Sequence, residues 1–318
     1  MTLSVGGHRY SDPDVLSLIK SRRGLVDPRA EVIRRAKKLN QELRSLGDIP
    51  EPRNRIEILA SLAGITVLPM SDQPTHAQNR EGLLFRNAGG HARAFYDPSL
   101  SDGRVNFTIA HEIVHTFFPN SVNGARFRNA HIDQSREATE LERLCHLGAS
   151  ELLMPEEEFV KERGDEFGLI DVPRSAGRFG SSYEATVYRL ATSYDGFALA
   201  GRLTYRLRLS EQRRLREAGQ PDLFRSDEST NADLKPKYRR QSLHYSPACG
   251  SRHLIPWNKS FDEGSHIHKA REPEAIGRAN ERLPNQSNQM GLLECVRAPY
   301  QDSSSDPNFP DVLFFWKV

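Results

Sequence analysis

The part of the chain best equipped for chemistry is a His-Glu-x-x-His motif at residues 111–115. Side chains four residues apart share one face of an α-helix, so His111 and His115 can point the same way and bind one zinc ion. Glu112 lies about 100° further round the helix than His111, where it can reach a water molecule on the metal without binding the metal itself. The motif therefore predicts a metal centre able to activate water.

The residues around the motif predict the helix that must carry it. Ile109, Ile113 and Phe117 are also four apart, and this second stripe can pack into a core while the histidines face a cleft. A chain with 11 histidines can contain the bare motif by coincidence. A third metal ligand from elsewhere in the chain is therefore needed to support a metal centre.

A second predicted helix, over residues 134–153, supplies the candidates for this third ligand. Its carboxylates are Glu137, Glu140, Glu142 and Glu151. An apolar stripe consists of Leu141, Leu144, Gly148 and Leu152, and a second stripe consists of Glu142, Cys145 and Ala149. An acid among small residues on a face expected to be buried is unusual, and a metal ion would stabilise it there. We therefore favour Glu142, and expect Glu140 to face water and Cys145 to be a packed thiol.

The segments before the motif predict two helices and a small sheet. Apolar residues at helical spacing predict a helix over residues 29–46, and Pro52 begins a second helix that ends near Gly64. Short strands are expected at 65–68, 82–86 and 92–96, with a turn at 87–90 joining the last two. The edge of this small antiparallel sheet could hold an extended peptide by strand addition. Residues 1–28 are expected to form an N-terminal extension.

Residues 161–196 predict a helix-turn-helix-like bundle. A short helix is expected to end at Gly180, and Ser181 with Glu184 has the spacing of a capping box at the start of the next helix. Three arginines of this segment could contact DNA phosphates, namely Arg174, Arg178 and Arg189. The alternative is a helical bundle that supports the metal centre, since the shape of the motif does not establish binding.

Residues 197–318 predict a linker and a C-terminal mixed α/β or β-rich domain. An alternating segment at 197–209 is expected to be a strand, residues 210–237 a partly helical linker, and short apolar segments beyond residue 238 alternate with polar turns. Six histidines and cysteines of this region match no zinc spacing, so a second metal site is not favoured: His244, Cys249, His253, His266, His268 and Cys295.

The composition of the chain indicates a globular protein. Its 318 residues carry a net charge of +2 and are 37% hydrophobic and 27% charged, which argues neither for nor against nucleic acid as a partner. No apolar run approaches the roughly 20 residues of a membrane helix, and the first residues lack the basic and apolar regions of a signal peptide. The three cysteines are far apart in sequence and are expected to be free thiols. We therefore expect a cytoplasmic protein without a membrane partner.

Two linked motifs resemble the ImmA/IrrE family of bacterial metallopeptidases. The first runs from Phe107 through Phe-Thr-x-Ala-His-Glu-x-x-His to His115, with Arg104 at the place of the family's basic residue. The second runs from Glu142 to the ending Leu-Leu-Met-Pro at 152–155. Their order and spacing are most similar to those of IrrE (PprI)-type radiation-response proteases, and the likeness covers about residues 30–195. His146 departs from it, because that branch usually has Asn at this position.

The resemblance implies a fold, an activity and a set of site residues. The fold is α+β, with a zincin-like (gluzincin) peptidase domain over residues 29–160. His111, His115 and Glu142 would bind Zn²⁺, with Mn²⁺ as the alternative, and Glu112 would be the catalytic base of a metallo-endopeptidase. The implied substrate is a helix-turn-helix repressor of the XRE type, cleaved during stress or the induction of mobile elements. Residues 197–318 would include a GAF-like sensor or recruitment domain.

Two other functions stay open at this point. One is a non-catalytic DNA-binding or scaffold regulator of transcription, and the other is a component of a toxin–antitoxin pair. Intact Glu112 and Glu142 favour the enzyme, because a decayed site tends to lose such residues. A peptidase also needs a donor that stabilises the oxyanion opposite its base. His146, Tyr96 and His131 are the candidates for that role, and the sequence does not choose among them.

Overall fold

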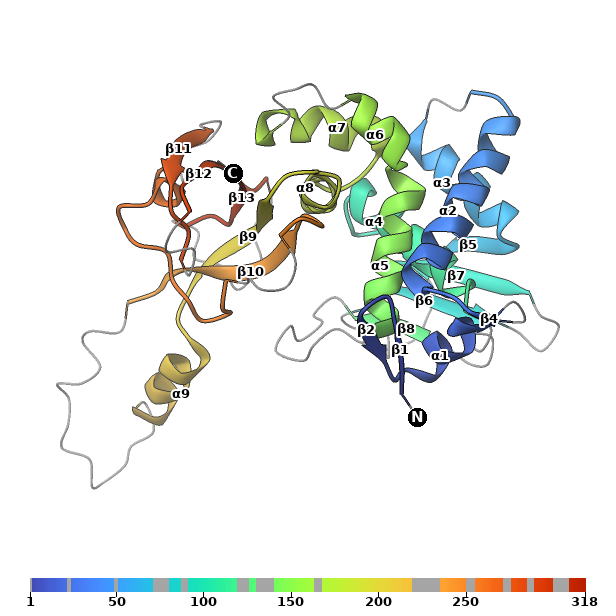
Figure 1. The fold of residues 1–318 in the computed structure, drawn as a ribbon, viewed down its shortest axis with the longest axis horizontal. Helices are drawn as coiled ribbons and strands as arrows, with labels where there is room; N and C mark the ends of the chain where they lie inside the picture. The colour runs from blue at the N-terminus through green and yellow to red at the C-terminus, as the bar shows by residue number, and fades with distance from the viewer. Residues whose placement is uncertain are drawn as a thin grey trace. The chain divides into compact units, whose positions relative to one another are not determined.

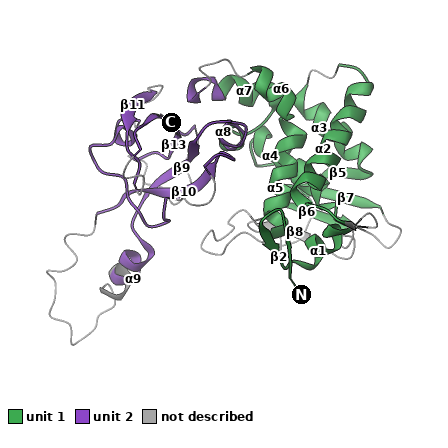
Figure 2. Cartoon of the chain, in the orientation of Figure 1, with its two compact units in different colours: residues 1–165, 173–186 green, residues 166–172, 187–318 purple. Residues whose placement is uncertain are grey.

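The computed structural model describes most of the chain as two compact units (Figures 1 and 2). The first unit comprises residues 1–165 and 173–186, and the second comprises residues 166–172 and 187–318. The described residues are 2–21, 24–48, 51–70, 80–86, 91–118, 126–129, 140–162, 168–218, 235–249, 255–270, 276–284, 289–299 and 309–318. The sequence-based domain boundaries after residues 28, 160 and 196 stay predictions.

The first unit begins with short elements and two longer helices. The short elements are β1 (Leu3–Val5), β2 (His8–Tyr10), α1 (Pro13–Ile19), β3 (Lys20–Ser21) and β4 (Gly24–Leu25). The predicted helices are present as α2 (Pro28–Ser45) and α3 (Pro52–Leu62). Each begins with a proline, whose fixed φ suits the first helical position and whose missing N–H would have no partner there.

The N-terminal extension is tied to the start of helix α5 (Glu140–Leu153). The Glu140 carboxylate accepts hydrogen bonds from the backbone N–H groups of Ser11, at 2.7 Å, and Asp12, at 2.8 Å. Burial acts to raise the pKa of Glu140, but these hydrogen bonds outweigh it and hold that pKa below its ordinary value. Glu140 therefore does more than face water, because it joins two segments far apart in sequence.

A four-stranded sheet supports the metal-binding motif, with the order β5-β7-β6-β8. Its strands are β5 (Ile65–Pro69), β6 (Arg80–Arg86), β7 (Ala92–Tyr96) and β8 (Arg126–Asn129). Strands β6 and β7 are antiparallel as predicted, but β5 pairs with β7 in parallel, so the prediction of an antiparallel sheet is wrong for this edge. Strand β6 lies between β5 and β7 in the sequence. The chain reverses direction between β6 and β7, so β7 runs in the same direction as β5, next to which it lies. The predicted turn at 87–90 lies outside the described residues.

The motif lies on α4 (Asp102–His115), which is exposed in its first turn and buried from Val105 onward, apart from the partly buried Phe107. Helix α4 contacts β6 and β7, α3 and α5. The stripe of Ile109, Ile113 and Phe117 is buried as predicted. The expected open histidine face is not observed, because every residue from 108 to 115 is buried. The part of the site that α4 contributes is therefore an interior one.

Gly148 sets the distance between α5 and the two helices it packs against. A Cβ atom at this position would lie 2.7 Å from Val114 Cγ2 and 2.8 Å from Val32 Cγ1, and both valines are fully buried. We expect Gly148→Ala to destabilise the first unit by about 1–3 kcal/mol, because the overpacking exceeds the gain in helix propensity. Urea unfolding followed by circular dichroism would measure this change.

Gly177 provides the matched control for that substitution. It is a helical glycine in α7 (Val172–Phe179) whose added Cβ would meet no atom within 4 Å. Gly177→Ala should leave stability unchanged or raise it by up to about 1 kcal/mol. An equal loss of stability in both variants would contradict the close approach of α5 to its neighbours.

Three helices follow α5, namely α6 (Glu156–Glu162), α7 and α8 (Tyr183–Thr192). Gly180 has φ +58°, which favours glycine at the end of α7. The hydroxyl of Ser182 accepts a hydrogen bond from the N–H of Ala185, so Ser182 and not Ser181 caps α8. Ser181 instead shares a hydrogen bond with the side chain of Thr186. None of the described helices is long and apolar enough to span a lipid bilayer.

The second unit is built on a five-stranded antiparallel sheet with the order β10-β9-β13-β12-β11. Its strands are β9 (Ala198–Arg206), β10 (Lys237–Tyr245), β11 (Gly277–Glu281), β12 (Gly291–Arg297) and β13 (Val312–Lys317). The unit also includes η1 (Leu169–Asp171), α9 (Leu209–Ala218) and η4 (His266–Lys269). Its core contains Tyr238, Phe261, Phe314 and Trp316. The chain thus has the predicted α+β class, and a GAF-like fold for this unit stays a prediction.

Two of the three thiols lie in the core of the second unit. Burial raises the pKa of Cys249 to about 11 and that of Cys295 to about 12. Both groups are therefore protonated at neutral pH, whereas the reactive species is the thiolate. We expect iodoacetamide at pH 8 to label neither cysteine in the folded chain and both after denaturation. Peptide mass spectrometry would measure this, and rapid labelling of either native thiol would contradict it.

Candidate metal centre

Helix α4 brings the two histidines of the motif together. His111 and His115 are one turn apart, and their Nε2 atoms lie 3.1 Å from each other. Their ring centroids are 4.8 Å apart with an interplanar angle of 74°. His111 is 0% exposed and His115 is 3% exposed. Two imidazole nitrogens at this separation could bind one ion.

Helix α5 adds a carboxylate to this pair. Glu142 Oε2 lies 3.0 Å from His111 Nε2, and Glu142 Oε1 lies 3.6 Å from His115 Nε2. When two ligand atoms each lie 2.0–2.1 Å from a tetrahedral zinc ion, they are about 3.3 Å from each other. The three observed separations fall on both sides of this value, and two nitrogens with one carboxylate are a donor set typical of catalytic zinc. The side chains present therefore fit a zinc ion.

Glu112 lies on α4 beneath a strand of the sheet. Its side chain is 1% exposed, and a Cβ atom added to Gly82 of β6 would lie 3.0 Å from Glu112 Oε1 and 2.4 Å from Thr108 Cγ2. Only glycine therefore allows β6 to approach the carboxylate so closely. The neighbouring Glu81 is buried and forms an ion pair with Arg104, in the first turns of α4.

The role of Glu81 and Gly82 was not predicted from the sequence. Glu81 immediately precedes the predicted strand at residues 82–86, and Gly82 is the first residue of that strand. A glycine within a strand pattern indicates close approach of another backbone or group, and this signal was present. No comparable sequence pattern marks Glu81, because its ion pair with Arg104 joins two segments that only the fold brings together.

Two further side chains of α5 lie beside the histidines. Cys145 Sγ is 3.5 Å from His115 Nδ1, the ring nitrogen that does not face Glu142. The ring of His146 lies 5.0 Å from that of His111 and 5.7 Å from that of Phe107. Two groups of side chains could each provide three close ligand atoms. One is His111, His115 and Cys145, and the other is His111, Glu142 and His146.

The other candidate ligands lie elsewhere. The carbonyl of Glu151 accepts a hydrogen bond from Asn40, and its carboxylate accepts one from the N–H of Glu156. The ring of Tyr96, which is a candidate for the oxyanion donor, is covered by the guanidinium of Arg53 at 4.7 Å. Glu137, His131 and His253 lie outside the described residues. Among the described part of the second unit, the remaining histidines and cysteines form no group of three that could hold a metal.

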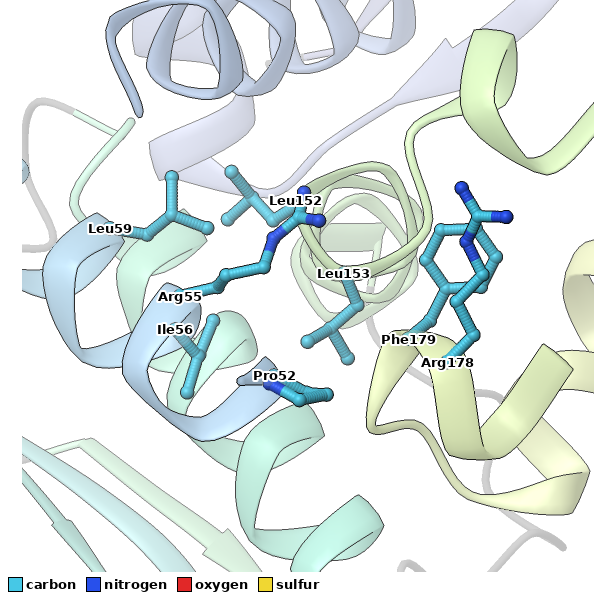
Figure 3. A pocket seen from close by; sticks show the side chains of 8 residues that line it. All are labelled: Pro52, Arg55, Ile56, Leu59, Leu152, Leu153, Arg178 and Phe179. Carbon is cyan, nitrogen blue, oxygen red and sulfur yellow. The ribbon is translucent and has the colours of Figure 1, made fainter. Parts of the chain in front are cut away.

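A small pocket in the first unit is separate from these donors (Figure 3). It is lined by Pro52, Arg55, Ile56, Leu59, Leu152, Leu153, Arg178 and Phe179. Both of its arginines form ion pairs with acids, Arg55 with Glu158 and Arg178 with Glu162. The pocket is thus lined by apolar side chains and by two arginines whose charges are neutralised by neighbouring acids. None of its residues belongs to the candidate metal centre.

Comparison with known proteins finds a peptidase family whose model covers the two helices of the candidate metal centre. A family model described as Peptidase_M78, IrrE N-terminal-like domain, matches residues 61–191, which include α4 and α5. No curated protein matches the chain. A solved structure of a Mycobacterium tuberculosis transcriptional regulator is similar in fold, with 16% identity and a TM-score of 0.50, over 90% of this chain and 87% of that one. Residues 61–191 therefore form an IrrE N-terminal-like domain of the Peptidase_M78 family.

Proposed function

We propose that the protein is a zinc-dependent endopeptidase that hydrolyses a peptide bond in a protein substrate. The observation that carries this proposal is the convergence of two imidazoles and one carboxylate from α4 and α5, with atoms 3.0–3.6 Å apart, on the helix that also carries the buried Glu112. The match to a peptidase family supports it. Mn²⁺ is the alternative metal.

His111, His115 and Glu142 would hold the metal. When bound, zinc lowers the pKa of a coordinated water to about 7 and polarises the carbonyl of the peptide bond. Three protein ligands leave one position for water or substrate, which is characteristic of catalytic sites. The contact of Cys145 with His115 Nδ1 would orient the second imidazole, since ligating histidines usually bond a neighbour through their other nitrogen.

Glu112 would act as the general base and then as the general acid. Its carboxylate accepts the proton of the attacking water and delivers it to the nitrogen of the departing amine. Burial beneath Gly82 keeps the carboxylate in one place on the helix and limits its access to bulk water. Positioning of this kind lowers the entropic part of the barrier, because the base need not be found by diffusion.

The substrate class follows from the resemblance to ImmA/IrrE proteins. We propose a helix-turn-helix repressor, cleaved as part of a stress response or of mobile-element derepression. Its scissile segment would be extended, and β8 at the edge of the sheet is the strand to which it could add. The second unit would detect the signal or recruit the repressor, as a GAF-like domain would.

A DNA-binding regulator without peptidase activity is the second candidate, because α7 and α8 are two helices joined by a tight turn. The arginines argue against it. Arg189 is only 5% exposed, so it is poorly placed to reach a phosphate, and Arg178 is paired with Glu162. The third predicted contact, Arg174, is exposed on α7. Two exposed arginines, one of them paired with an acid, would give weak DNA binding.

The test is incubation of the full chain with a repressor encoded beside it, with zinc and with a chelator. Cleavage that requires zinc, stops with chelator and returns when zinc is restored would support the endopeptidase. Tight binding of the repressor or of DNA without cleavage at any metal concentration would favour the second candidate and overturn the first. Glu112→Gln serves as the inactive control.

A further inference from the structure

His146 lies where α5 faces the two histidines of α4. It is four residues after Glu142, so both side chains project from one face of α5, just as His111 and His115 project from one face of α4. Its ring is half-buried and lies beside the rings of Phe107 and His111, with centroids 5.7 Å and 5.0 Å away. The two helices thus direct four potential donors toward one volume.

The spacing of the rings matches that of imidazoles on a common ion. With zinc–nitrogen bonds of 2.0–2.1 Å and tetrahedral angles, the centroids of two bound imidazoles are about 5.2 Å apart. The His111–His115 pair is separated by 4.8 Å and the His111–His146 pair by 5.0 Å. In addition, one ligand atom each of His111, Glu142 and His146 lie within 4.8 Å of one another. The ring of His146 is therefore about as far from the ring of His111 as the ring of His115 is.

We propose that His146 is a fourth protein donor to the metal, giving the resting centre three imidazoles and one carboxylate. The inference rests on the proposed function, since it concerns the metal of that same site. A centre with four protein donors has no open position. Water or a peptide carbonyl can then bind only when His146 leaves or when the coordination number rises to five. His146 would therefore control entry of the substrate to the metal.

Cys145 is the competing candidate for this position, but its placement differs. Its sulfur contacts Nδ1 of His115, whereas Nε2 of that ring points toward His111 and Glu142. The thiol therefore lies behind His115 rather than among the converging atoms. A thiolate ligand would also be recognised directly, because sulfur binds zinc at about 2.3 Å rather than the 2.0–2.1 Å of nitrogen.

X-ray absorption at the zinc edge, on the full chain loaded with one equivalent of zinc, tests the proposal. The wild type should show three imidazoles, no sulfur and one carboxylate, and His146→Asn should show two imidazoles. Competition with a fluorescent chelator should give a zinc affinity at least about 100-fold lower for His146→Asn, because loss of a ligand should exceed the roughly 10-fold to 100-fold cost of losing a group that only supports one. His244→Asn is the matched control, because His244 packs against Tyr188 outside the donor set, and it should change neither result.

The outcomes separate this inference from the proposed function. Two imidazoles in the wild type, or equal imidazole numbers in wild type and His146→Asn, would overturn the fourth donor while leaving the metallopeptidase intact. A zinc–sulfur distance would assign the position to Cys145 and also overturn it. Failure of the wild type to bind zinc would overturn both. The wild-type spectrum alone decides the point if the variant does not fold.

Discussion

Glu112→Gln is expected to abolish peptide-bond hydrolysis while leaving zinc bound. Glutamine has nearly the same shape as glutamate but cannot accept the proton of the attacking water. Removing a general base costs on the order of 10²–10⁴ in rate. The Nε2 atoms of His111 and His115 converge on Glu142, so the metal should be retained. The measurement is kcat/KM for repressor cleavage, together with zinc content by mass spectrometry.

Glu151→Gln is the control for this substitution. Glu151 is also a buried glutamate of the first unit, 2% exposed, but its carboxylate contacts the backbone of Glu156 rather than the candidate centre. This variant should cleave the repressor at nearly the wild-type rate. Wild-type activity in Glu112→Gln would show that another group is the base, and the proposed mechanism would then be wrong.

Glu142→Gln is expected to cause the largest loss of metal. The amide is neutral and a much weaker zinc ligand than a carboxylate. Changes to groups that only support a ligand cost about 10-fold to 100-fold in affinity, so loss of the ligand itself should exceed about 100-fold. Chelator competition would measure the affinity, and hydrolysis at low zinc concentration should fall in parallel.

Glu140→Gln is the matched control on the same helix. Its carboxylate binds the backbone of Ser11 and Asp12 and belongs to neither group of candidate ligands. We expect this variant to bind zinc normally and to unfold at lower urea concentration, because a neutral amide accepts hydrogen bonds more weakly than a carboxylate and offers one acceptor oxygen in place of two. If Glu142→Gln keeps wild-type affinity, the third ligand is another residue, with His146 and then Cys145 the next candidates.

Several elements of the first unit could be predicted because their signals are local. Helices α2 and α3 follow from apolar residues at helical spacing and an initial proline, and β6 and β7 from two short apolar segments around a turn. The N-cap of α8 is Ser182, one residue after the predicted Ser181. The prediction missed by one residue because two adjacent serines offer the same capping hydroxyl. Only the geometry of the turn after Gly180 distinguishes them.

The i, i+4 spacing of His111 and His115 predicts that they share one face of any helix that contains them. The sequence also indicates Glu142, through its small neighbours Cys145 and Ala149. Three features appear only in the folded chain. Strand β5 joins the sheet in parallel, Gly82 packs closely against Glu112, and the ring of His146 lies about as near to that of His111 as the ring of His115 does. The physical reason is that helical periodicity is a property of consecutive residues. The distance between α4 and α5 depends instead on which side chains separate them, and Gly148 keeps it short.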